Sequence, residues 1–236
     1  VTQPSLVSGP IPPLLPGQVP YFMSGLIASA AQRSDLSLIN AASGSIGDLK
    51  LYFTAGSVQA SIASLQPLGF AQSINLENIV GSVYGTTGSG ALQVRSANAD
   101  SISAIAKVTA GTDAGTYTGA IPVFRGDRSA IAGQKIILAG LAAGADVLVQ
   151  ETLGSVGIVG ITFLNAAGAT VSTRTENIAA YGLLELNAAV PPNAVTAIVQ
   201  GSGWAMITAH ARLRDVHGDT WSVVDWSRFY DYQRNS

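Results

Sequence analysis

Short runs of alternating apolar and polar residues recur along the chain from Tyr21 onward. The clearest alternation occupies residues 36–38, 49–53, 58–62, 92–95 and 195–199. Successive side chains of a strand point to opposite faces, so a period of two indicates antiparallel sheets with one buried and one exposed face. No segment keeps a period of 3.6 residues, and a single helical turn is expected only at residues 76–80. The pattern therefore predicts an all-β protein.

The second half of the sequence repeats features of the first half in the same order. Five pairs of segments match at a spacing of about 105 to 115 residues: 25–28 with 140–143, 49–56 with 159–166, 68–76 with 181–187, 104–108 with 209–213, and 115–117 with 219–221. Such self-similarity indicates tandem structural units. Short strands separated by turn residues are typical of a β-sandwich, and a barrel is the alternative. We expect two antiparallel β-sandwich domains, Ig-like or jelly-roll-like, over residues 21–125 and 133–236.

The first twenty residues differ from the rest because they contain six of the ten prolines. Proline fixes φ and removes a backbone donor, so residues 1–20 are expected to form an extended arm. An extended segment can add to a sheet edge of a neighbouring molecule, which predicts an assembly arm. The arm residues expected to make this contact are Pro4, Leu6, Pro10, Ile11, Leu14, Leu15, Pro16 and Val19.

The composition narrows the classes of partner and location. Hydrophobic residues make up 47% of the chain and charged residues only 11%, so much of the surface is uncharged or covered by other subunits. Twelve basic and fourteen acidic residues, with no cluster of either sign, argue against nucleic acid. Nearly uncharged apolar stretches, such as residues 136–145, are broken by Gly and too short for a transmembrane segment. The chain begins with Val1, as signal-peptide removal would leave it, so we expect a secreted, extracellular or cell-surface protein.

Candidate catalytic and metal-binding residues are few. The chain has no cysteine, and its two histidines are His210 and His217. His210 takes the place of Ile105 in the repeat, which favours a packed or edge-exposed residue over a catalytic one. Residues 215–219 place Asp and His side chains on a turn, which is more typical of a hairpin than of a cation site. No nucleophile motif precedes a helix either, so we expect no enzyme activity, no cofactor and no metal.

Aromatic residues offer one candidate binding surface. Trp204, Trp221 and Trp226 all lie in the second half, and Tyr230 follows them. Exposed aromatic rings can stack on sugar rings, so these four residues are a candidate ligand-stacking surface. A contact with another subunit, or packing in the core of the domain, would account for the same side chains. Packing in the core is the simplest of the three interpretations.

Two segments of the first half resemble a known repeat unit. Residues 35–40 form a Leu-containing strand that ends in Asn40, and residues 115–122 combine a Gly-Thr-Tyr turn with an Ile-Pro pair. On these motifs, residues 21–236 resemble the tandem β-sandwich repeat modules of secreted bacterial extracellular proteins. The second copy departs from the pattern, because residues 147–150 lack the closing Asn and residues 223–225 replace the Ile-Pro pair. The resemblance implies an exported module without known catalysis, and it adds no site residues.

Together these features favour a non-catalytic extracellular structural protein. It is expected to form a homo-oligomer or homopolymer, as the subunit of a filament, appendage or surface layer, through contacts between its arm and a sheet edge. The first alternative is a glycan-binding or adhesive module of a secreted protein, with a surface glycan as its partner. A viral capsid or spike component is a further alternative, because it would share the strand content and the scarcity of charge.

Overall fold

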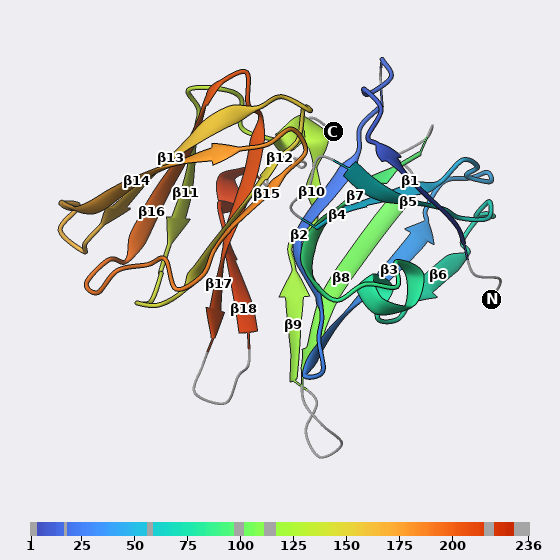
Figure 1. Ribbon diagram of the computed structural model, residues 1–236, viewed down its shortest axis with the longest axis horizontal. Coiled ribbons are helices and arrows are strands. Elements are labelled where there is room, and N and C mark those ends of the chain that lie inside the picture. The colour runs from blue at the N-terminus through green and yellow to red at the C-terminus, as the bar shows by residue number, and fades with distance from the viewer. Residues whose placement is uncertain are drawn as a thin grey trace.

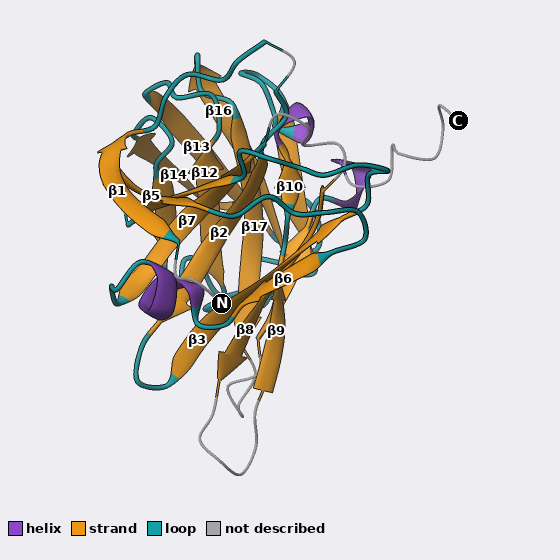
Figure 2. Ribbon diagram, turned by 90° about the vertical axis from the view of Figure 1, so that its right-hand side faces the viewer, coloured by secondary structure: helices purple, strands orange, loops and turns teal. Residues whose placement is uncertain are grey.

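The computed structural model describes residues 4–16, 18–55, 59–96, 102–110, 117–214 and 220–228. Figures 1 and 2 show that this part of the chain is built almost wholly of strands, which confirms the all-β prediction. The strands of the first half are β1 (Ser5–Pro10), β2 (Tyr21–Ala28), β3 (Gln32–Asn40), β4 (Lys50–Thr54), β5 (Gln59–Ser64), β6 (Ser73–Leu76), β7 (Gly88–Arg95), β8 (Ile102–Ala110), β9 (Tyr117–Ile121) and β10 (Phe124–Arg125). Those of the second half are β11 (Lys135–Ala139), β12 (Asp146–Glu151), β13 (Gly157–Leu164), β14 (Thr170–Ile178), β15 (Leu183–Leu186), β16 (Thr196–Gly203), β17 (Ile207–Arg214) and β18 (Thr220–Val224).

Helical structure in the described residues is limited to three short turns, η1 (Ile79–Val83), η3 (Gly126–Arg128) and η4 (Trp226–Arg228). The first of them lies between β6 and β7. It overlaps the helical turn expected at residues 76–80 and continues past its end, after Asn78 turns the chain with a φ of 47°. Within the described ranges, no helix has the length and apolar character that crossing a membrane would require.

Every pairing between the described strands is antiparallel, and the strands form three sheets. The first half contributes a ten-stranded sheet in the order β1-β5-β4-β7-β2-β3-β8-β9, with β10 on β2 and β6 on β3. The second half contributes two four-stranded sheets, β11-β16-β13-β14 and β15-β12-β17-β18. The alternating runs recognised in the sequence fall in β3, β4, β5, β7 and β16.

The same order of strand pairing occurs in both halves of the chain. The group β5-β4-β7-β2 corresponds to β14-β13-β16-β11, and β6-β3-β8-β9 corresponds to β15-β12-β17-β18. In the first half a single residue pair, Ala28 with Arg33, joins the two groups into one sheet. Left-handed backbone positions recur as well, because Gly25 and Gly140 have φ values of 82° and 81°. The matches of residues 49–56, 68–76 and 104–108 therefore involve corresponding strands, namely β4 and β13, β6 and β15, and β8 and β17.

Buried side chains form one large cluster in each half. In the second half, Val147 and Val149 of β12 pack in the same cluster as Ile161 and Phe163 of β13, although the two strands belong to different sheets. The corresponding cluster of the first half contains Leu36 of β3 together with residues of β2, β4 and β7. Burial of such side chains stabilises each half by roughly 25 cal/mol per Å² of apolar surface removed from water.

A third, small cluster lies where the two halves meet. It consists of Phe22 of β2, Phe124 of β10 and Val224 of β18. Figure 1 shows β2, β9 and β10 of the first half beside β17 and β18 of the second half. The two halves are therefore packed against each other along these strands.

Candidate assembly site

The arm forms the edge strand of the ten-stranded sheet. β1 pairs with β5 through six residue pairs, from Ser5 opposite Ser64 to Pro10 opposite Gln59. Most of its side chains remain in solvent, with Leu6 47% and Val7 62% exposed. Since little apolar surface is buried, the backbone ladder is the main attachment of this strand. The arm is thus held by a sheet edge of its own chain.

The predicted arm contacts divide into two groups. Half-buried side chains belong to Pro4, Ile11, Leu14 and Val19, whereas exposed ones belong to Leu6, Pro10, Leu15 and Pro16. The exposed group includes Leu15, which is 69% exposed. Apolar arm side chains are therefore available on the surface.

Arg95 at the end of β7 fastens the arm and the second half to the same sheet. Its Nη1 donates a hydrogen bond of 2.7 Å to the carbonyl oxygen of Pro12, and its Nη2 donates one of 3.0 Å to Oε1 of Gln93. The guanidinium lies 4.9 Å from the ring centroid of Tyr52 and 5.5 Å from that of Tyr181. Cation–π contacts of a buried guanidinium are stabilising. A single side chain thus connects three parts of the molecule.

An ion-pair network lies on the surface of the second half that faces the first half. Arg212 donates to Oδ2 of Asp146 at 2.8 Å and to Oε1 of Glu185 at 2.8 Å, and Arg214 also donates to Asp146 at 2.8 Å. Ser89 of the first half donates to the other oxygen of Glu185. Burial alone would raise the pKa of Asp146, but the N–H of Ala188 and the two arginines lower it overall. The network therefore joins the halves and favours the ionised carboxylate.

The first half contains a counterpart of this ion pair. Asp35 accepts a hydrogen bond of 2.8 Å from the N–H of Asn78, as Asp146 accepts one of 2.9 Å from the N–H of Ala188. Asn78 and Ala188 share a left-handed conformation, with φ values of 47° and 48°. Lys107 then pairs with Asp35 at 3.7 Å, in the place of Arg212.

The two ion pairs differ in their exposure. The side chain of Lys107 is 50% exposed, whereas that of Arg212 is 11% exposed. The first half covers the arginine, while nothing of comparable extent covers the lysine among the described residues. The same motif is therefore exposed in one half and enclosed in the other.

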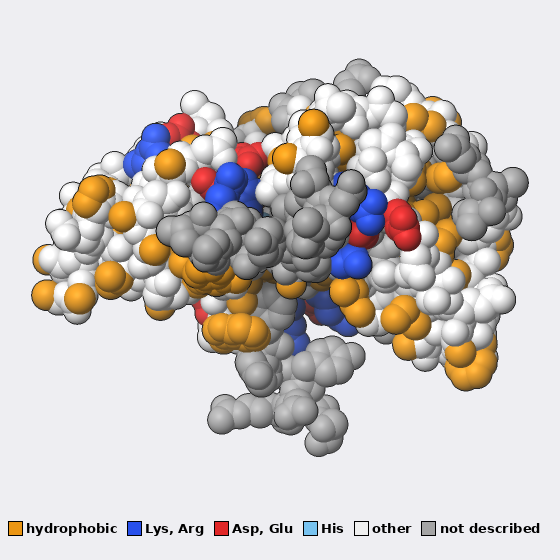
Figure 3. Space-filling model, turned by 90° about the horizontal axis from the view of Figure 1, so that it is seen from below, with side chains coloured by type: hydrophobic (Ala, Val, Ile, Leu, Met, Phe, Trp, Pro, Cys, Tyr) orange, Lys and Arg blue, Asp and Glu red, His pale blue; other side chains and the backbone are white. Residues whose placement is uncertain are grey.

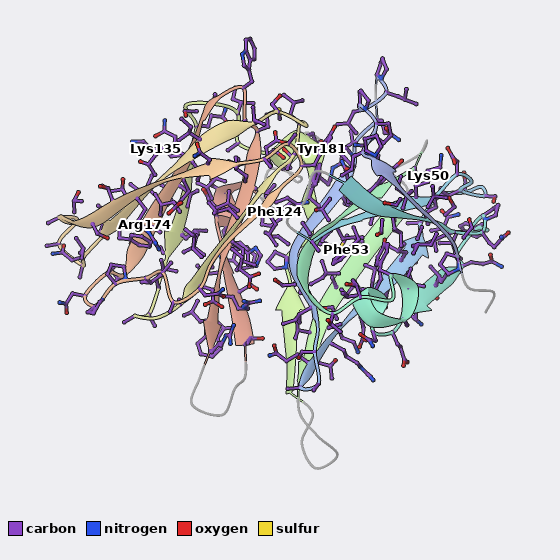
Figure 4. The ribbon with its side chains drawn as sticks, in the orientation of Figure 1. Lys50, Phe53, Phe124, Lys135, Arg174 and Tyr181 are labelled. Carbon is purple, nitrogen blue, oxygen red and sulfur yellow. The ribbon has the colours of Figure 1, made fainter. Side chains whose placement is uncertain are left out.

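His210 occupies the centre of this junction. Its Nδ1 lies 3.3 Å from Oγ of Ser24, and its ring centroid is 6.3 Å from that of Phe124. Burial, supported by the charge of Arg212, lowers its pKa to about 3, so the imidazole is neutral. Figure 4 shows Phe124 and Tyr181 between the two halves. His210 is thus a packed residue, although Ile105 at the same repeat position is 56% exposed.

β2 approaches β12 closely beside this histidine. A Cβ placed on Gly25 would lie 2.6 Å from Cδ2 of Leu148, and Gly25 also has a positive φ of 82°. Only glycine satisfies both conditions without strain. The absence of a side chain at this position therefore sets the spacing between the halves.

Glu151 organises the end of β12 and was missed in the sequence. Its buried carboxylate accepts backbone N–H groups of Leu153 at 2.9 Å, Gly154 at 2.7 Å and Tyr181 at 2.9 Å. Burial raises its pKa, while these hydrogen bonds act in the opposite direction. Asn40 ends β3 in the same way, but it donates to carbonyl groups, including that of Leu68 at 2.8 Å. The Asn missing from the end of residues 147–150 is therefore replaced by a carboxylate that only accepts, whereas Asn40 both donates to carbonyl groups and accepts the N–H of Ala42 at 2.8 Å.

The candidate stacking residues are exposed but do not form one platform. Trp204 is 82%, Trp221 48% and Trp226 63% exposed. Trp204 precedes β17, whereas Trp221 pairs with Leu213 near the other end of that strand. The eight-residue strand separates them by roughly 20 Å at about 3.3 Å per residue. Tyr230 and residues 215–219, with His217, lie outside the described residues.

The buried polar groups of the junction offer no route for a substrate. Ser24 is 1% and His210 2% exposed, so the serine and histidine are closed off from solvent. No group of three or more potential metal ligands occurs among the residues that the structure describes. The chain matches no protein-family model and no curated protein.

Proposed function

We propose that this chain is a non-catalytic structural protein of the cell exterior, built from two tandem antiparallel β-sandwich units over residues 21–125 and 133–236. The repeated strand order supports the tandem units, and the shared cluster of β12 and β13 supports sheets packed face to face. The low charge, 11% of residues, suits a surface that contacts other protein. Its role is to assemble into a filament, appendage or surface layer.

The observation that carries this proposal is the attachment of the arm. β1 is a separate strand on a sheet edge, joined to the rest by residues 11–20, which include Pro12, Pro13, Pro16 and Pro20. Ten extended residues reach at most about 35 Å. The arm can therefore leave its own β5 and pair with β5 of a neighbouring copy through the same hydrogen bonds. Exchange of an identical element is a low-energy route to oligomers.

A cross-link between β1 and β5 tests this exchange. Ser8 lies opposite Ser61, and the chain contains no cysteine, so Ser8→Cys with Ser61→Cys introduces one defined pair. Directly opposite residues have Cβ atoms about 4.5–5.5 Å apart, within reach of a disulfide after a small shift. Oxidation of assembled protein is expected to give species of two or more chains on non-reducing SDS gels, which return to one chain on reduction.

The matched control is Ser5→Cys with Ser61→Cys. Ser5 lies opposite Ser64 rather than Ser61, so this variant has the same number of cysteines but the wrong register. It is expected to cross-link far less. If assembled protein with the Ser8/Ser61 pair gives only intramolecular disulfides, the arm stays on its own chain and this mechanism is wrong.

Glycan binding is a second candidate, favoured by the three exposed tryptophans. All the tryptophans of the chain are among them, so intrinsic fluorescence reports directly on any stacked sugar. A saturable change on titration with an oligosaccharide, lost in Trp204→Ala, would favour an adhesive module. An unchanged spectrum across a panel of surface glycans would leave the structural role as the better account.

A further inference from the structure

The junction within the chain joins two different sheet faces. We call the outward face of β2, β4 and β7 in the first half its A face; its residues Phe22, Ser24, Tyr52 and Gln93 are all at most 4% exposed. We call the outward face of β12 and β17 in the second half its B face; it carries Leu148, Gln150, His210 and Arg212. The A face of one half thus binds the B face of the other.

The repeated strand order identifies the two faces that remain open. Strand pairing places Ile137, Ala139, Thr162 and Ile198 of the second half where the first half has Phe22, Ser24, Tyr52 and Gln93. It likewise places Ser37 and Ile105 of the first half where the second half has Leu148 and His210. Ile137 is 48% and Ile105 56% exposed. Each molecule therefore presents one A face and one B face to solvent.

The open faces match each other at the centre of the contact. Within the chain, the polar Ser24 meets the polar His210. At the same positions the open faces carry Ala139 and Ile105, so both residues of this pair are apolar where Ser24 and His210 are polar. A Cβ on Gly140 would meet nothing within 4 Å, so the surface beside it is open; on the open B face Ser37 takes the place of Leu148, which packs beside Gly25 in the closed junction.

Few charges lie near the centre of this contact. The four A-face residues of the second half are uncharged, although Lys135 shares the exposed face of β11 with Ile137 and Asp225 accepts a hydrogen bond of 3.0 Å from the N–H of Ile137. On the open B face, Lys107 is paired with Asp35. Figure 4 shows Lys135 and Arg174 on the side of the second half turned away from the first half, which is the side of the open A face. Figure 3, from below, likewise shows hydrophobic side chains on both halves and charged ones in a few small groups.

We propose that the open A face of one molecule binds the open B face of a second copy, in the arrangement that joins the two halves within the chain. The two faces differ, so the contact is head-to-tail and leaves one free face of each kind after every addition. Such heterologous contacts extend into filaments unless a ring closes. This inference rests on the structural role proposed above, but it does not require exchange of the arm.

Two face variants of the full chain test the proposal. Ile137→Asp blocks the A face, and Ile105→Asp blocks the B face, because each change places a charge where an apolar contact is expected. Wild-type protein is expected to form species that grow with concentration in sedimentation velocity, whereas each variant alone should remain a monomer. An equimolar mixture should form one species of twice the monomer mass, since each variant retains the face that the other lacks.

Trp204→Asp is the matched control, because Trp204 is more exposed than either isoleucine and lies on the turn between β16 and β17, outside both faces. It should assemble like the wild type. Monomeric wild-type protein at all concentrations, undiminished assembly of the face variants, or a mixture that stays monomeric would each overturn the proposal. The same face variants can also carry Ser8→Cys and Ser61→Cys. A mixed dimer that forms but shows no intermolecular disulfide after oxidation would support the face contact and contradict exchange of the arm.

Discussion

Replacing Asp146 by alanine is expected to lower the free energy of unfolding of the second half by about 3–5 kcal/mol, because it leaves a buried arginine without its main partner. Arg212 keeps Glu185, but Asp146 also holds Arg214 and the backbone N–H of Ala188. Urea unfolding followed by tryptophan fluorescence measures the effect. All three tryptophans belong to the second half, so the signal reports on the part of the chain that contains Asp146.

Asp35→Ala is the matched control for this change. Asp35 is 6% exposed and Asp146 5%, so the two carboxylates are equally buried. The side chains of Lys107 and Arg33 are about half exposed, however, and water can replace the lost partner. We expect a loss of about 1–2 kcal/mol, measured by circular dichroism. Equal losses in the two variants would show that enclosure by the other half does not strengthen the pair.

The second large effect expected is a loss of stability in mild acid caused by His210. The folded pKa of about 3 lies below the ordinary value of 6.5, so between these values the unfolded chain binds a proton that the folded chain excludes. Stability is therefore full above pH 6.5 and falls as the pH drops, by about 1.4 kcal/mol per pH unit. Between pH 6.5 and the folded pKa of about 3, the total loss of stability is on the order of 4 kcal/mol.

A double variant isolates the contribution of His210. Ser24→Ala with His210→Ile copies the apolar pair found at the open faces and removes the titrating group. Asp146 and Glu151 remain in both proteins, so their own titrations cancel in the difference. Urea unfolding at a series of pH values is expected to show a shallower dependence for the double variant above pH 5. Parallel curves would mean that His210 is not protected from protonation in the folded state.

Several features of the fold could be predicted from the sequence because they depend on neighbouring residues. Alternation of apolar and polar positions located β3, β4, β5, β7 and β16, since the side chains of a strand alternate whatever its partners are. The matching segments also aligned Ile105 with His210, and that alignment agrees with the pairing of β8 and β17. The tandem sandwich units themselves stay a proposal.

The junction could not be predicted, because its contacts join residues that are far apart in the sequence. Ser24 and His210 are 186 residues apart, and neither residue type distinguishes an interface from a core. The role of Glu151 was hidden for another reason, since a carboxylate replaces an amide and keeps its acceptor but not its donor.

The position of the arm has a consequence for how the ten-stranded sheet ends. β1 covers the edge of β5, and its paired segment is bounded by Pro4 and Pro10, which lack the N–H groups that a further strand would need. Prolines and short strands at sheet edges are a known protection against uncontrolled aggregation. The same segment that could link two copies in order therefore also stops the sheet from growing indefinitely. Loss of the arm would expose the bare edge of β5, whose free backbone groups a strand of another molecule could then pair with.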